Sequence, residues 1–277
     1  MTKLSRRHFS TAILALGVAA PSLARAQAAA PSEETWEAIK GDIFKDRPIL
    51  DGAGVVALDA PRRAEDAAIV PIGMKVTLPD GDARQLKSLT LVIDENPAPV
   101  AGVFAIGADS GVTAISTRVR VNTYSYVRAV AELSDGKLYG VKAFVKASGG
   151  CSAPVSANAD AAKATLGQMK FKTFAPAADA QSGASPEAQI MVRHPQNSGL
   201  QLDQLTRLYI PPFFIETLKV MQGDALALSL DGGIAISEDP NIRFNYKPNG
   251  AKVFRVEAID TAKNAFANEW PTEKAVL

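Results

Sequence analysis

Apolar and polar residues alternate along much of this chain, which is the pattern of β-strands that bury one face. Every second residue from Val70 to Leu78 is apolar. The same alternation returns at 89–93, after the turn at 79–82, which reads Pro-Asp-Gly-Asp. We expect these two runs to be neighbouring strands. Further strand-like runs in this half of the chain lie at 103–106, 114–121, 124–133 and 137–146.

The second half of the chain has strand-like runs of its own, at 190–192, 213–222, 225–230, 242–246 and 253–259. Residues 175–186 contain no large apolar side chain and are interpreted as a linker. Short strands separated by Gly and Asp turns are typical of antiparallel sandwiches. The sequence therefore predicts an all-β fold. It consists of two immunoglobulin-like β-sandwich domains, at 27–174 and 187–277, joined by the linker.

One short helix is predicted ahead of the first strand. Residues 33–44 carry Trp36, Ile39, Ile43 and Phe44 at helical spacing. We expect this face to pack on the first domain.

The N-terminal segment has the three parts of an export signal. The pair Arg6 and Arg7 precedes an apolar run at 11–20, and small residues follow up to Ala26. Adjacent arginines indicate the twin-arginine route, and the apolar run is shorter than the roughly 20 residues of a spanning helix. We expect residues 1–26 to be a twin-arginine signal peptide, cleaved after Ala26. The mature protein is then expected to be periplasmic, without a membrane anchor.

The charge balance argues against a nucleic-acid partner. The chain holds 30 Lys and Arg residues against 29 Asp and Glu residues, and the expected signal removes four basic residues and no acidic one. The mature chain has 26 against 29, with the charges scattered. Such a chain lacks the basic patch that binds nucleic acids or anionic membranes. We expect its partners to be proteins or small molecules.

Few residues can carry chemistry. After residue 26 the chain has one cysteine, Cys151, and one histidine, His194. These are too few for a thiolate zinc site or an internal disulfide. No Gly-x-Ser-x-Gly motif is present, and His194, next to Pro195, is expected at the surface or in an edge strand. Asp94 and Glu95 are interpreted as part of a solvated turn. The sequence thus predicts no catalytic residue, metal site or cofactor, and we do not expect an enzyme.

Very small residues surround Cys151. Residues 147–150 read Ala-Ser-Gly-Gly and residues 152–154 read Ser-Ala-Pro. Structural cysteines are usually buried among other core residues, which this segment lacks. Gly149 and Gly150 also give the backbone wide freedom. We therefore expect the thiol on an exposed, mobile loop, with the two glycines supplying its flexibility.

An unpaired thiol in an oxidising compartment is prone to oxidation and mixed disulfides. Its retention is explained if the thiolate forms reversible covalent bonds, as in a persulfide, a thioester or a disulfide. Three interpretations of Cys151 stay open: a carrier thiol, an intermolecular disulfide site, or an inert residue.

Together these features resemble the SoxYZ sulfur-carrier family, in the form of a single-chain SoxY–SoxZ fusion. The SoxY-like features are Arg6-Arg7, the helix at 33–44 and Ser148-Gly149-Gly150-Cys151; the SoxZ-like features are 186–190, His194-Pro195 and a closing hairpin at 241–258. One departure concerns the arm. SoxY ends in Gly-Gly-Cys-Gly-Gly, whereas Cys151 is followed by Ser152-Ala153-Pro154 and the chain continues.

The resemblance implies a function in two forms. In the first, Cys151 covalently holds a sulfur species, as in thiosulfate oxidation, and presents it to periplasmic oxidoreductases. The fusion resembles SoxYZ-like carriers associated with quinoprotein dehydrogenases, so another thiol-reactive group, such as an aldehyde or acyl product, stays open as cargo. In the alternative, the protein is a non-catalytic binding or assembly module for such a dehydrogenase or its cytochrome. Exposed apolar residues such as Tyr209 would then form the interface.

Overall fold

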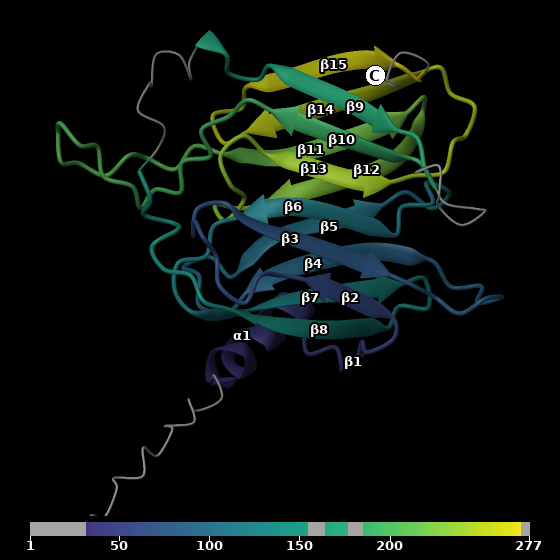
Figure 1. Ribbon diagram of the computed structural model, residues 1–277, viewed down its shortest axis with the longest axis horizontal. Helices are drawn as coiled ribbons and strands as arrows, with labels where there is room; N and C mark the ends of the chain where they lie inside the picture. Colours follow the sequence, from purple (N-terminus) through teal and green to yellow (C-terminus); the bar gives the residue numbers. More distant parts are fainter. Residues whose placement is uncertain (1–31, 155–163, 177–184, 273–277) are drawn as a thin grey trace, which may run out of the picture. The chain divides into compact units, whose positions relative to one another are not determined.

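The computed structural model describes residues 32–154, 164–176 and 185–272. Its strands form two sheets that lie face to face, with a helix at one side (Figure 1). The predicted signal peptide and most of the predicted linker lie outside the described residues.

Among the described residues, the larger sheet has nine strands, which are antiparallel except for one parallel pair at its edge, formed by its first two strands. In spatial order they are β1 (Ile49–Asp51), β8 (Leu138–Val145), β7 (Ser125–Leu133), β4 (Leu86–Ile93), β5 (Val100–Ile106), β12 (Ala225–Gly232), β11 (Ile215–Gln222), β14 (Val253–Asp260) and β15 (Ala265–Pro271).

The smaller sheet has six strands in the described part of the chain, all antiparallel to their neighbours. In spatial order they are β2 (Val56–Asp59), β3 (Val70–Val76), β6 (Ala114–Val119), β13 (Asn241–Asn245), β10 (Glu187–Val192) and β9 (Met169–Phe174).

Both sheets continue from the first predicted domain into the second (Figure 1). In the larger sheet β5 pairs with β12, and in the smaller sheet β6 pairs with β13. A single apolar core lies between the sheets and includes Ile72 and Leu89 from the first half and Phe244 and Phe254 from the second. The described residues belong to one compact unit. The predicted all-β sandwich fold with a short N-terminal helix is confirmed, and its two halves share one core.

The alternation of apolar residues is explained by this core. In β3, Val70, Ile72, Met74 and Val76 are buried, and the residues between them are exposed or half-buried. β4 and β7 lie inside the larger sheet and are buried on both faces. The outer face of these central strands is covered by helix α1 (Glu34–Phe44).

Helix α1 forms where the sequence predicts it. Trp36 and Phe44 are buried with their ring centroids 6.1 Å apart. They pack against Val92, Val130 and Leu138 of the larger sheet. This second apolar cluster attaches the helix to the sheet.

Two expected strand pairings are wrong. β3 lies in the smaller sheet and β4 in the larger one, so they are not neighbours. The expected hairpin at 241–258 is divided in the same way, because β13 and β14 belong to different sheets. The connections cross from one layer to the other. A strand in either layer turns one face to the shared core, so alternation alone cannot tell which sheet it joins.

Asp94 is also placed differently from the solvated turn that we expected. Its side chain is 3 % exposed and accepts hydrogen bonds from Arg128 at 2.7–2.9 Å. Arg128 also donates to Glu33 at 2.5 Å and lies 4.2 Å from the ring of Trp36. Burial raises the pKa of Asp94, although Arg128 opposes that rise. These contacts tie the start of α1 to the sheet.

Four strands were not expected: β1, β2, β9 and β15. β9 lies within the range 27–174 of the first predicted domain, yet its neighbour in the sheet is β10 of the second. The start of the linker at 175 therefore follows a strand that belongs to the second half of the sheet.

Candidate functional site

The segment that contains Cys151 folds back against the end of β6. We call residues 147–154 the cysteine arm. Gly149 N–H donates to the carbonyl of Asn122 at 2.7 Å, and Gly150 N–H donates to that of Val121 at 3.1 Å. The arm is thus held to the first half of the molecule by its backbone.

Both glycines of the arm are required by this geometry. Gly149 has a φ of +80°, which strongly favours glycine. A Cβ on Gly150 would lie 2.1 Å from the carbonyl oxygen of Ala67. The sequence predicted that these glycines supply flexibility; in the docked arm they allow a left-handed turn and a close approach between backbones.

The expectation of an exposed thiol is wrong for this structure. Cys151 is 0 % exposed. Its immediate neighbours in sequence are small, and residues from distant parts of the chain help to cover it. Ser198, 47 positions further along the chain, donates from its hydroxyl to the carbonyl of Cys151 at 2.5 Å. A local sequence pattern carries no information on such a distant contact.

An arginine from the first half of the molecule holds the other side of the arm. Arg120 directly follows β6 and is 1 % exposed. Its Nη1 donates to the carbonyl of Gly150 at 3.1 Å, and its Nη2 donates to the carbonyl of Gln196 at 3.5 Å. Cys151 therefore lies where the two halves of the chain meet.

Burial controls the charge of this thiol. It raises the pKa of Cys151 to about 11, while the nearby guanidinium of Arg120 acts in the opposite direction. With that pKa, about one thiol in ten thousand is ionised at pH 7. Because the thiolate is the nucleophile, the docked cysteine reacts slowly with electrophiles.

The segment 194–201, which follows β10, supplies the second-half contacts of the arm, and it is rich in buried polar residues. His194, Gln196, Ser198 and Gln201 are each at most 4 % exposed. The Gln201 side-chain oxygen accepts from Ser198 N–H at 2.8 Å, and that of Gln196 accepts from Ile215 N–H at 2.7 Å. Sequence reasoning missed this cluster, for which the one local signal was a run of polar residues after a strand.

His194 is placed differently from the surface or edge position that we expected. It is 2 % exposed, its ring centroid lies 4.5 Å from that of Phe213, and its Nε2 lies 3.5 Å from a carboxylate oxygen of Asp260. Burial lowers the pKa of His194, and the neighbouring Asp260 only partly offsets this. The side chain supports the base of the loop that follows.

That loop extends away from the sheets between β10 and β11 (Figure 1). We call residues 199–213 the apolar finger. Four of the eight large apolar residues that are exposed among the described residues lie within it: Leu202, Leu205, Leu208 and Tyr209. Its tip is ordered by the carboxylate of Asp203, which accepts from the N–H groups of Leu205 and Thr206.

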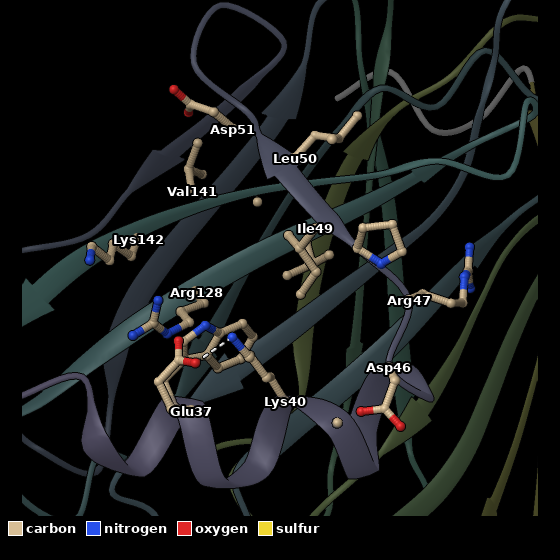
Figure 2. Close-up of a pocket in the computed structure, with 15 residues that line it drawn as sticks. Glu37, Lys40, Asp46, Arg47, Ile49, Leu50, Asp51, Arg128, Val141 and Lys142 are labelled. Atoms are coloured by element: carbon tan, nitrogen blue, oxygen red, sulfur yellow. Dashed lines mark hydrogen bonds and ion pairs between the residues drawn. The ribbon is translucent and has the colours of Figure 1, made fainter.

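A pocket of about 680 Å³ lies elsewhere, between α1 and strands β1, β7 and β8 (Figure 2). Two of its charged residues form short ion pairs. Figure 2 shows Lys40 paired with Glu37 at 2.5 Å along one face of the helix. Arg128 pairs with Asp94 at 2.7 Å. Neither Cys151 nor the residues that hold its arm line this pocket. In the described part of the chain, no three His, Cys, Asp or Glu side chains gather as a metal site would require.

Comparison with known families decides the membership of the chain. The model of "Sulfur oxidation protein SoxY" matches residues 40–151, and that of "Sulphur oxidation protein SoxZ" matches residues 173–271. The chain is a SoxY–SoxZ fusion. The SoxY match ends on Cys151, and the SoxZ match includes Ser198 and the apolar finger. SoxY and SoxZ proteins are carriers of sulfur oxidation and generally have no catalytic role.

Solved structures with some similarity cover less of the molecule. The sulfur carrier protein SoxY from Chlorobium limicola f thiosulfatophilum is 22% identical, with 40% of this chain and 89% of that chain covered and a TM-score of 0.32. A superoxide reductase (neelaredoxin) from Ignicoccus hospitalis is 13% identical over the same shares, with a TM-score of 0.30. Neither likeness carries a functional argument. No curated protein matches the chain.

Proposed function

We propose that this SoxY–SoxZ fusion is a periplasmic covalent carrier. Cys151 holds a sulfur species, or another thiol-reactive group, and presents it to oxidoreductases that load, transform or unload it. The protein itself supplies no catalytic group. The observation that carries this proposal is the end of the SoxY match on a cysteine whose arm is docked through hydrogen bonds of its main chain.

The contacts of the arm fit a segment that must both dock and leave. Four hydrogen bonds of its backbone hold it. Its carbonyls accept from Arg120 and Ser198, and its N–H groups donate to the carbonyls of Val121 and Asn122. Each is worth about 1 kcal/mol net, so the arm opens at a cost of a few kcal/mol. The docked thiol is covered and neutral, and the released thiol regains its ordinary pKa and becomes reactive.

The proposal includes export by the twin-arginine route. It rests on Arg6 and Arg7 ahead of the apolar run at 11–20, and it would place the thiol in an oxidising compartment. In the described residues no helix has the length and apolar character needed to cross a membrane. Burial of Cys151 in the docked arm would protect an unloaded thiol from adventitious oxidation in such a compartment.

Intact-protein mass spectrometry on the chain purified from its native cells tests the carrier function. We expect a mass increment on Cys151, and the same preparation of Cys151→Ser should lack it. A phosphine reductant removes a group held through a sulfur–sulfur bond and leaves an acyl or aldehyde-derived group in place, so the size of the increment and its response to reduction distinguish the two classes of cargo. A bare cysteine in cells that grow on the relevant substrate would contradict the proposal.

One observation favours a second function, that of a binding or assembly module for a quinoprotein dehydrogenase or its cytochrome. The tip of the apolar finger exposes Leu205 at 93 % and Tyr209 at 66 %, whereas Phe213 at its base is half-buried against His194. Exposed apolar residues grouped on one loop are typical of protein interfaces. In this function Cys151→Ser leaves partner binding unchanged and Leu205→Ser weakens it, as co-purification of the tagged chain with the dehydrogenase would reveal.

A further inference from the structure

Arg120 has an unusual environment for a buried arginine. Its acceptors in the described part of the chain are two main-chain carbonyls, those of Gly150 and Gln196, and its Nε is buried without a hydrogen-bond partner there. The carboxylates of Glu238 and Asp66 act on it electrostatically, and the hydrogen bonds that its guanidinium donates go to the two carbonyls. Buried charges normally have a partner of opposite charge, because an uncompensated one is expensive to desolvate. The site of Arg120 therefore favours the arrival of an anion.

The cysteine arm can bring such an anion to Arg120. Arg120 binds the carbonyl of the residue directly before Cys151. Of the groups that act electrostatically on Arg120, Cys151 comes first, followed by Glu238 and Asp66. The bare thiol is neutral in its docked state, so it does not balance the guanidinium. A negatively charged group on the sulfur would.

We propose that Arg120 is the charge partner of an anionic adduct on Cys151, so that the docked arm retains a negatively charged adduct in preference to a neutral one of the same size. A persulfide or an S-sulfonate belongs to the favoured class, and an uncharged acyl or alkyl group does not. This inference rests on the proposed carrier function and narrows its cargo. Arg120 acts here as a positioning residue.

The physical reason is the low polarity around the site. Arginine stays protonated in proteins, so its charge is present in every state of the arm. Attraction between opposite charges strengthens where water is excluded. A neutral adduct adds volume next to the guanidinium without adding electrostatic attraction to it.

Two isosteric adducts test the preference on the unsubstituted chain. Briefly opened in mild denaturant, the Cys151 thiolate displaces iodide from iodoacetate or from iodoacetamide, and a carbon–sulfur bond forms. The products, carboxymethyl and carbamidomethyl, have nearly the same shape and differ by one negative charge. After refolding, amide hydrogen exchange of residues 148–153 reports how firmly each arm is docked.

We expect exchange in the arm to be about tenfold slower with the carboxymethyl adduct, which corresponds to about 1.4 kcal/mol. Equal exchange in the two proteins, faster exchange with the charged adduct, or an unprotected arm in both would overturn the inference. This comparison needs no substitution, so a variant that fails to fold cannot obscure it.

Two variants then assign the effect to Arg120. Arg120→Lys keeps the charge and should keep the preference for the charged adduct. Arg120→Gln removes the charge and should abolish or reverse that preference. A preference that persists in a folded Arg120→Gln protein would overturn the assignment. Both adducts are synthetic, so failure here leaves the carrier function standing, and absence of a native adduct would remove the carrier function while leaving the charge preference measurable.

Discussion

Two regions of the molecule each bury an arginine, and the two arginines differ in the groups that accept their hydrogen bonds. In the helix-covered region, formed by α1 and the outer face of β4 and β7, Arg128 binds Asp94 and Glu33 and stacks on Trp36. In the cysteine region, formed by the arm, the segment 194–201 and the apolar finger, Arg120 donates to main-chain carbonyls instead.

The pKa directions follow from this difference. Burial lowers the pKa of both arginines, but for Arg128 the hydrogen bonds to Asp94 and Glu33 outweigh burial, and the pKa is raised. For Arg120 burial prevails and the pKa is lowered. The helix-covered region has its charges paired and its apolar residues packed. The cysteine region buries an arginine whose hydrogen bonds go to main-chain carbonyls, and it exposes apolar side chains on the finger.

The largest change in stability should come from breaking the buried ion pair between Arg128 and Asp94. Arg128→Met leaves Asp94 buried without its cation, and we expect the free energy of unfolding to fall by about 3–5 kcal/mol. Urea denaturation measures this. The control is Lys87→Met, which removes an exposed partner of Glu132 and should change stability by at most about 1 kcal/mol. A similar loss of unfolding free energy in Arg128→Met and Lys87→Met would show that the buried pair of Arg128 and Asp94 contributes no more than an exposed ion pair.

A smaller effect should appear with rising pH in the cysteine region. The pKa of Cys151 is raised from 9.0 to about 11 in the folded protein. The unfolded thiol therefore ionises first, and the contribution of the buried neutral thiol is complete below pH 9 and is lost as the pH rises through about 11. The loss amounts to about 3 kcal/mol at most.

The pH effect is measured as the difference in unfolding free energy between the native chain and Cys151→Ser, because lysine and tyrosine ionisation then cancels. The serine variant should lack the loss above pH 9. Parallel pH profiles of the two proteins would contradict a buried, neutral thiol.

A still smaller effect is expected from the contact that Ser198 makes with the arm. Ser198→Ala removes the hydrogen bond to the carbonyl of Cys151, which is worth about 1 kcal/mol. The arm should open about five times more often, and maleimide labelling of Cys151 should accelerate by that factor. Ser152→Ala is the control, because its hydroxyl bonds within the arm to Gly149. An unchanged labelling rate in Ser198→Ala would mean that other contacts limit opening.

The smallest effect on stability should come from the tip of the apolar finger. Leu205 is 93 % exposed, so Leu205→Ser should change the free energy of unfolding by at most about 0.5 kcal/mol. Urea denaturation and the rate of Cys151 labelling should both match those of the native chain. A large loss of stability would show that the finger packs on the sheets in solution.

Strand positions were largely predictable from the sequence because a two-residue period requires only local information. β3, β7 and β8 lie within one or two residues of the runs expected for them. Their pairing was less predictable, since a strand in either sheet contributes its apolar face to the same core. β1, β2, β9 and β15 were not predicted. β1 and β15 have no buried residue, and β9 follows the alanine-rich segment 155–168.

The sequence identified Cys151 as the candidate residue, but it did not predict that the side chain is buried or which residues surround it. Small neighbours singled out Cys151, and the SoxY match ends on that residue. Its burial depends on Arg120, 30 positions before Gly150, and on Ser198, 47 positions after Cys151. The buried state of His194 likewise depends on Asp260 and Phe213, from other parts of the chain. Such contacts join residues that are far apart in the sequence and are brought together by the fold.

The continuity of both sheets across the SoxY and SoxZ halves has a consequence for stoichiometry. Arg120 comes from one half and Ser198 from the other, and both halves are parts of one polypeptide joined by strand pairing. In a carrier made of two separate chains, dilution would separate the thiol from half of its cover. Here the cover is intramolecular, at a fixed effective concentration. Protection of the thiol is therefore independent of how much protein the cell makes.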